Sequence, residues 1–174
     1  MAILNAGSLN PHGAPVLRRY TLTNSIVTTA GDSMKLASGF AALGTTGASV
    51  LGHAINLSTN AGVGVNSSGA AGAELGSFLG TYTAASDNQT VANVKAEMDI
   101  SKETIYSAEV DAAIGTTTGS NLAGYFMDLS DEDTLDEDTA ATTTGQYATH
   151  GVDPANSAKA LVTVFESVIF GPLA

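Results

Sequence analysis

Short runs in which apolar and polar residues alternate follow one another along most of this chain of 174 residues. A period of two places successive side chains on opposite faces of a strand, so these runs predict β-strands. Small residues and turn formers separate the runs, and Gly31 with Asp32 marks a tight turn. The predicted strands cover residues 18–23, 25–29, 33–37, 49–57, 62–65, 77–83, 90–100, 104–111, 122–129 and 159–170.

No long stretch carries the apolar stripe of an amphipathic helix, and the short candidate at residues 108–114 is ended by Gly115 and the threonines that follow. Many short strands between turns are typical of a small β-barrel or a β-sandwich. No repeat period of the kind seen in solenoids or propellers is present. We therefore expect an all-β fold with a single barrel or sandwich domain over residues 17–174.

Residues 1–16 contain prolines and glycines without sustained periodicity, which predicts an extended N-terminal arm. Apolar side chains on this arm suggest that it docks on another protein surface; the alternative is a frayed terminus. Tyrosines on the predicted strands are candidate interface anchors, because tyrosine combines a rigid ring with a polar tip. The residues expected to contact a partner are Ile3, Leu4, Leu9, Val16, Tyr106 and Tyr125.

The segment at residues 60–76 is rich in Gly, Ala and Ser. Such residues bury little apolar surface, so we expect a loop here. The alternative is backbone pressed closely against a neighbour, where only small side chains fit.

Charge narrows the choice of partners. The chain has six Lys and Arg residues and a formal net charge of -11, which opposes nucleic-acid binding because that binding depends on clustered cations. No apolar run approaches the roughly 20 residues of a membrane span, and no signal-peptide pattern is visible. We expect a soluble protein made in the cytoplasm, with no nucleic-acid or membrane partner. Without cysteine, stability has to come from packing and from neighbouring subunits.

Residues that usually carry chemistry are sparse. The acidic cluster at residues 131–138 could offer oxygen ligands to calcium, but it lacks the spacing of a calcium loop, and mutual repulsion predicts a solvated loop instead. His12, His53 and His150 are far apart in sequence; His53 is expected to be a partly buried strand residue and His150 a turn residue. No nucleophile-elbow or phosphate-loop pattern occurs. We expect no enzyme activity, no cofactor and no metal.

Three stretches of the chain resemble the virion structural proteins of tailed bacteriophages that decorate or cement the capsid. They are RRYTLTNSIVTTAGDSMKLASGFAALGTTGASVLGHAINL, TIYSAEVDAAIGTTTGSNLAGYFMDL and ALVTVFESVIF. The resemblance implies a β-barrel or sandwich bound to the outside of the major capsid protein lattice, with a terminal arm that crosses onto a neighbour. It also implies that residues 104–129 form barrel strands, with Tyr106 and Tyr125 in paired strands.

These patterns together predict a homo-oligomeric structural protein of the virion, located on the capsid exterior. Low charge and abundant small residues suit surfaces that lie against other proteins. The alternative is a tail-tube, fibre or surface-filament subunit, which would share the same low-charge β-composition.

Overall fold

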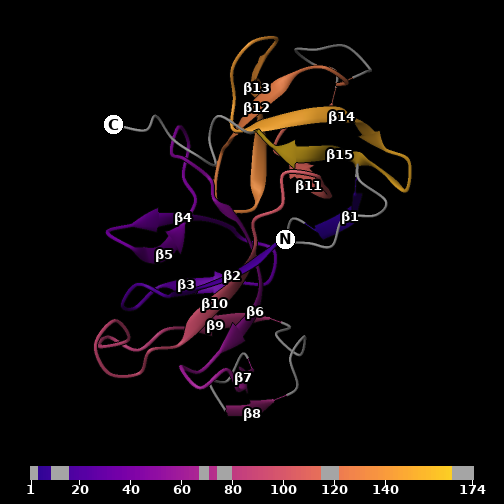
Figure 1. The fold of residues 1–174 in the computed structure, drawn as a ribbon. Helices are drawn as coiled ribbons and strands as arrows, with labels where there is room; N and C mark the ends of the chain where they lie inside the picture. Colours follow the sequence, from indigo (N-terminus) through magenta and orange to yellow (C-terminus); the bar gives the residue numbers. More distant parts are fainter. Residues whose placement is uncertain (1–3, 9–15, 67–70, 74–79, 115–121, 166–174) are drawn as a thin grey trace.

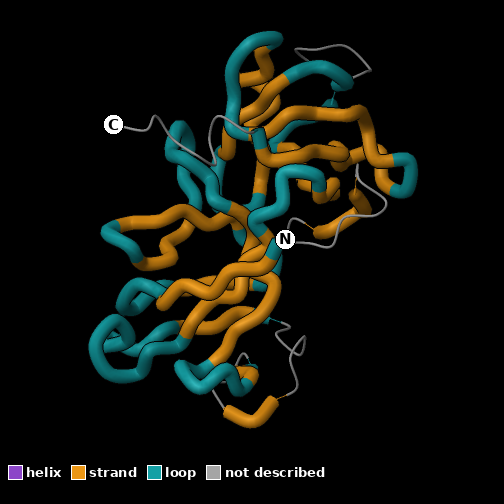
Figure 2. The backbone as a smooth tube through the Cα atoms, viewed as in Figure 1, coloured by secondary structure: helices purple, strands orange, loops and turns teal. Residues whose placement is uncertain are grey.

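The computed structural model describes residues 4–8, 16–66, 71–73, 80–114 and 122–165 of the chain. Every regular element among these residues is a β-strand, which confirms the all-β class. Figure 1 shows the strands gathered into an upper body at the C-terminal end and a lower body at the N-terminal end, and Figure 2 shows the loops that connect them.

The upper body is a closed barrel of five strands. Its members are β11 (Thr104–Val110), β12 (Phe126–Leu129), β13 (Thr134–Ala141), β14 (Tyr147–Asp153) and β15 (Asn156–Val164). The strands follow the order β11-β13-β12-β14-β15, and β15 pairs back onto β11 to close the barrel. β11 and β13 run parallel, whereas the other neighbours are antiparallel. We call this unit the C-terminal barrel.

The lower body is built around β2 (Leu17–Thr21), β4 (Ser33–Ala37), β5 (Phe40–Leu43), β6 (Gly52–Ser58) and β10 (Lys95–Asp99). These strands follow the order β2-β10-β6-β4-β5 with antiparallel neighbours. A parallel bridge between Leu22 and Ala41 joins the two ends of this sheet, and the Thr23 N–H donates to the Ala41 carbonyl at 2.9 Å. We call this unit the N-terminal barrel.

Five further strands lie outside the two rings. β3 (Val27–Thr29) pairs with β9 (Thr81–Thr83), while β7 (Gly64–Val65) pairs antiparallel with β6 on one side and with β8 (Ala71–Ala73) on the other. β1 (Leu4–Ser8) pairs antiparallel with the first half of β11. Residues 4–8 of the predicted arm are therefore extended, and this strand pairs within its own chain.

The two barrels repeat one topology. If the five ring strands of each barrel are numbered in chain order, both rings read first-fifth-fourth-second-third, with a parallel contact between the first and third. Backbone hydrogen bonds repeat as well: the Asp111 N–H donates to the Leu135 carbonyl at 2.9 Å, which matches the bond from Thr23 to Ala41. The fourth strand of each ring bulges at the same place, at Ile55 in one and His150 in the other. The two halves of the chain thus share one topology, and we refer to this repeat of the topology as the duplication.

The matched positions keep a short sequence signature. Residues 30–36, AGDSMKL, hold the same register positions in their ring as residues 123–129, AGYFMDL, hold in theirs. Gly31 and Gly124 both have positive φ, 98° and 85°, which glycine adopts without strain. Both methionines, Met34 and Met127, are fully buried. Each barrel buries its own apolar cluster, around Met34, Leu57 and Met98 in one and around Met127, Leu135 and Val162 in the other.

Several sequence-based expectations need correction. Within the range expected as one barrel or sandwich, the described strands form two rings, which leaves the number of domains as a prediction. β11 and β12 are not paired, because β13 lies between them, so Tyr106 and Tyr125 are not in paired strands. The acidic cluster is a loop only up to residue 133, and the rest of it belongs to β13. His150 lies on β14 rather than in a turn. The glycine-rich segment contributes β7 and β8, and residues 67–70 and 74–76 lie outside the described residues.

Candidate functional site

A buried polar cluster joins the two barrels. It is formed by Ser33 and His53 of the N-terminal barrel and by Tyr106 and Tyr147 of the C-terminal barrel, all of them 1% exposed or less. The His53 ring lies 4.0 Å from the Tyr106 ring and 5.7 Å from the Tyr147 ring, measured between centroids. We call these four residues the junction cluster.

The hydrogen bonds of the junction cluster have one consistent direction. His53 Nδ1 lies 3.3 Å from the Gly31 carbonyl, which can only accept, so Nδ1 carries the proton. His53 Nε2 then accepts from the Tyr147 hydroxyl at 3.3 Å, and the Tyr147 oxygen accepts from the Ser33 hydroxyl at 2.8 Å. This chain of donors uses neutral histidine. Burial agrees with it, because burial lowers the pKa of His53 to about 4.

Backbone contacts reinforce the junction. The Ser33 N–H donates to the Glu132 carbonyl at 2.7 Å. Gln146 links the barrels through its side-chain amide, which donates to the carbonyls of Thr45 (3.0 Å) and Ala48 (2.6 Å) and accepts from the Leu129 N–H at 2.7 Å. The barrels are therefore held by directional contacts from several elements rather than by a flexible linker alone.

A second buried group lies where β10 runs on toward β11. Asp99 is 2% exposed, and its carboxylate accepts from the Ser101 N–H and the Thr104 hydroxyl, both at 2.9 Å. Burial, with the Asp99 carboxylate close by, raises the pKa of Tyr106 far above its ordinary value. Burial also raises the pKa of Tyr147, so both tyrosines of the junction cluster are protonated at neutral pH.

Asp32 is the buried carboxyl with a clearly shifted titration in this region. Burial raises its pKa to about 6, against hydrogen bonds from the Thr29 N–H (2.6 Å) and the Thr28 hydroxyl (3.1 Å); the charges of Glu132 and Asp133 raise it further. Because the folded pKa is above the unfolded one, the protonated form stabilises the fold at low pH, and this stability is lost as pH rises through about 6. His53 acts oppositely, since its stability contribution is lost as pH falls through about 4.

We expect Asp32→Asn to separate the opposite effects of Asp32 and His53 on how stability changes with pH. Without the Asp32 carboxyl, stability should rise more steeply with pH than in the wild type, so the variant should gain about 2 kcal/mol relative to the wild type between pH 4 and pH 6. The measurement is urea unfolding at half-unit pH steps for both proteins. Parallel stability curves would show that the Asp32 carboxyl titrates normally.

The predicted partner-binding residues have different positions. Leu4 opens β1 and pairs with Ser107, and Val16 is 43% exposed just before β2. Tyr125 is half-buried. Tyr106 is 1% exposed, so it is a core residue of the junction and not a surface anchor. Ile3 and Leu9 lie outside the described residues.

The acidic cluster is only partly the solvated segment that its charge predicts. Glu137 points into the C-terminal barrel and is fully buried, and its backbone N–H donates to the Asp111 carboxylate at 3.1 Å. Asp131 and Asp138 are exposed. Within the described parts of the chain, no three His, Cys, Asp or Glu side chains are grouped as a metal site would require.

A surface depression of about 390 Å³ lies between the β5–β6 loop and the β13–β14 loop. Gly47, Ser49, Thr143 and Gly145 line it together with the Asp128 carboxylate. The described residues that line it supply hydroxyl groups, backbone groups and one carboxylate, and no histidine is among them.

The sequence contained signals for two of these features. Two copies of Ala-Gly-x-x-Met-x-Leu could have revealed the duplication, although two short matches are a weak signal alone. His53 within an apolar strand was expected to be partly buried, and it is fully buried. The contact of His53 with Tyr106 and Tyr147 joins residues far apart in sequence, so no local pattern could predict it.

No helix in the described residues has the length and apolar character needed to cross a membrane. Comparison with protein-family models, curated proteins and solved structures gives no match to this chain.

Proposed function

We propose that this chain is a structural protein of a phage particle, which binds the outside of the capsid lattice and strengthens contacts between capsomers. The observation that carries the proposal is the position of the side chains that could otherwise serve in catalysis. His53, Tyr106 and Tyr147 are all buried at the junction, where they fix one barrel against the other. A doubled barrel held in this way offers two linked surfaces at a fixed spacing.

Two linked surfaces suit a lattice. If each barrel makes a modest contact with one capsomer, the second contact forms at high effective concentration once the first is made. The depression between the β5–β6 and β13–β14 loops lies at the seam of the barrels, where a partner loop could contact both. The resemblance in layout to capsid decoration proteins supports the same proposal. A tail-tube, fibre or filament subunit is the second candidate, and the open strand edge described below favours it.

The test is co-sedimentation of the purified chain with undecorated capsids of the same virus, alongside a pull-down with the unassembled capsid subunit. We expect tight binding to capsids and weak binding to free subunit. Occupancy should change little across the physiological range of salt, because the chain has few cations to form screened ion pairs.

Equal binding to free subunit, or no binding to capsids, would contradict the decoration role. In that case negative-stain microscopy of the purified chain would test the second candidate, since a filament subunit should polymerise alone.

A further inference from the structure

The duplication gives the chain two equivalent strand edges. A further strand covers one of them, and no described strand covers the other. In the C-terminal barrel, β13 pairs with the last residues of β11, and β1 covers the remaining stretch at residues 104–107. In the N-terminal barrel the matching stretch is residues 16–19, at the start of β2. Among the described residues, no strand pairs with that stretch on the side away from β10. We call it the β2 edge.

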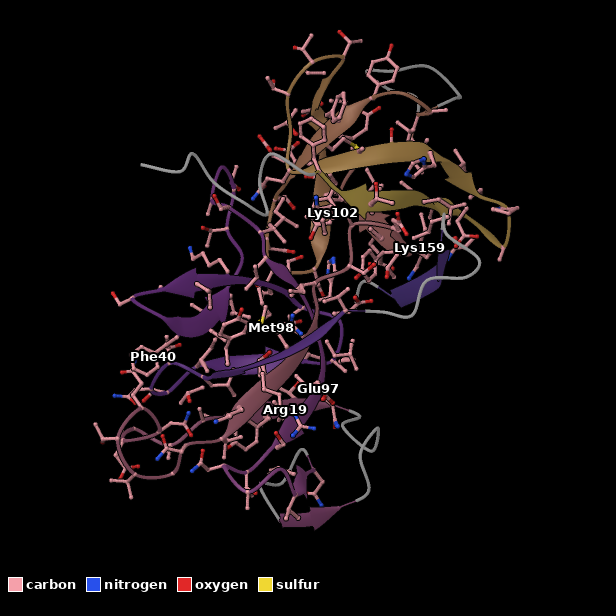
Figure 3. All side chains as sticks on the ribbon, in the orientation of Figure 1. Arg19, Phe40, Glu97, Met98, Lys102 and Lys159 are labelled. Atoms are coloured by element: carbon pink, nitrogen blue, oxygen red, sulfur yellow. The ribbon has the colours of Figure 1, made fainter. Side chains whose placement is uncertain are left out.

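Exposure reflects the missing strand. Val16 and Leu17 are 43% and 40% exposed, and Arg18 and Arg19 are exposed as well. The counterparts of Leu17 and Arg19 on β11 are less exposed: Ile105 is half-buried and Ser107 is 8% exposed. Arg19 forms an ion pair with Glu97 at 3.1 Å, and both side chains are labelled in Figure 3. The exposed Arg18 guanidinium donates to the Leu17 carbonyl at 3.0 Å, so a strand added at this edge has to displace that side-chain hydrogen bond.

The backbone groups on this edge can be assigned. The Ile100 N–H donates to the Val16 carbonyl and the Leu22 N–H donates to the Val94 carbonyl, so the even-numbered residues of this strand face β10. Since hydrogen-bonding direction alternates along a strand, Leu17 and Arg19 direct their N–H and C=O groups away from β10. In the C-terminal barrel the matching residues, Ile105 and Ser107, pair with Gly7 and Leu4 of β1.

Two β2 edges cannot easily pair with each other. An antiparallel pairing of two β2 edges through the outward-facing groups of Leu17 and Arg19 sets Leu17 of one copy opposite Arg19 of the other. The Arg18 side chains of the two copies then lie directly opposite each other, and their like charges repel. β1 has the uncharged sequence LNAGS. In the register seen on β11, it would set Leu4 opposite Arg19 and Asn5 opposite Arg18, without any like-charge pair.

We propose that the β2 edge accepts the N-terminal strand, Leu4–Ser8, of a second copy of this chain. The mode is β-strand addition, in which backbone hydrogen bonds supply most of the affinity. The donor strand leaves an equivalent edge on its own β11, so backbone hydrogen bonds of the same type are broken there and made at the β2 edge. Such exchange of an element between copies is a low-cost route to assembly. The contact is head-to-tail, because donor and acceptor surfaces differ.

The first experiment uses a fluorescent peptide of residues 1–10 and the full-length chain, whose own β1 occupies β11. We expect saturable binding by anisotropy. Leu17→Pro should weaken it at least tenfold, because proline removes an N–H that faces the open edge and makes no bond to β10. The matched control Leu17→Ala keeps that N–H and should bind like the wild type. Absent binding, or equal binding by Leu17→Pro, would overturn the proposal.

A second experiment covers the case in which Leu17→Pro fails to fold. The chain has no cysteine, so single cysteines report without background. A copy with Asn5→Cys mixed with a copy with Arg18→Cys should form a mixed disulfide dimer under mild oxidation, since directly opposite residues of this kind bring their Cβ atoms close. Asn5→Cys mixed with Val91→Cys is the control, because Val91 is 69% exposed on a distant loop. Equal yields in the two mixtures would contradict the strand register. Neither experiment contains capsid, so this inference and the decoration role can fail separately.

Discussion

Replacing Gly52 with alanine should destabilise the protein by at least about 3 kcal/mol, a loss large enough to prevent folding in many small proteins. A Cβ at Gly52 would overlap the carbonyl oxygen of Asp99 and lie 2.8 Å from its carbonyl carbon. Both obstacles are backbone atoms of the segment that leads from β10 into the C-terminal barrel, so they cannot swing aside as a flexible side chain would. The measurement is the urea unfolding midpoint, with expression level as a first indication.

Gly47→Ala is the matched control for Gly52→Ala. Gly47 has φ of 69° and no atom within 4 Å of an added Cβ, so alanine there costs only the left-handed backbone conformation, about 1–2 kcal/mol. If the two alanine variants lose equal stability, close approach of the connecting segment is not what requires glycine at position 52.

Tyr147→Phe should cost about 2–4 kcal/mol, because it removes one oxygen that serves two buried partners. The Ser33 hydroxyl would lose its acceptor and His53 Nε2 would lose its donor, both in a site without exposure to water. Each orphaned buried group costs about 1–3 kcal/mol. Thermal and urea unfolding of the variant would measure the loss.

Two further variants separate the hydrogen-bond chain from general effects of losing a hydroxyl. Tyr125→Phe changes the same residue type at a half-buried position and should stay within about 0.5 kcal/mol of the wild type. Adding Ser33→Ala to Tyr147→Phe should cost less than the sum of the two single changes, since it removes a hydroxyl that is already orphaned. Strict additivity would show that Ser33 and Tyr147 do not interact.

The sequence predicted strands best where a strand has one face in a core and an ordinary alternation. Residues 33–37 match β4 in full, and residues 104–111 match β11 to within one residue. β13 was missed because its alternation is carried by acids: Leu135 and Glu137 point inward, while Asp136 and Asp138 face outward. Charge predicted a solvated loop, and only tertiary packing around Glu137 overrides that prediction.

At the candidate site too, tertiary packing overrides what the local sequence predicts. Tyr106 was predicted as a contact residue for sound chemical reasons, yet the second barrel covers it with His53. Nothing local distinguishes a tyrosine that meets a partner protein from one that meets the other half of its own chain. The open edge at residues 16–19 could not be predicted either, because it is recognised only by comparison with the edge that β1 covers.

The duplication is unequal in one respect that affects how the chain folds. The fourth and fifth ring strands are joined through Pro154 and Ala155 in the C-terminal barrel, whereas residues 59–94 separate them in the N-terminal barrel. Closing the longer loop costs roughly 2 kcal/mol more chain entropy. Contacts that are local in sequence also form faster. We therefore expect the C-terminal barrel to form first and the N-terminal barrel to close later, against the surface of the C-terminal barrel.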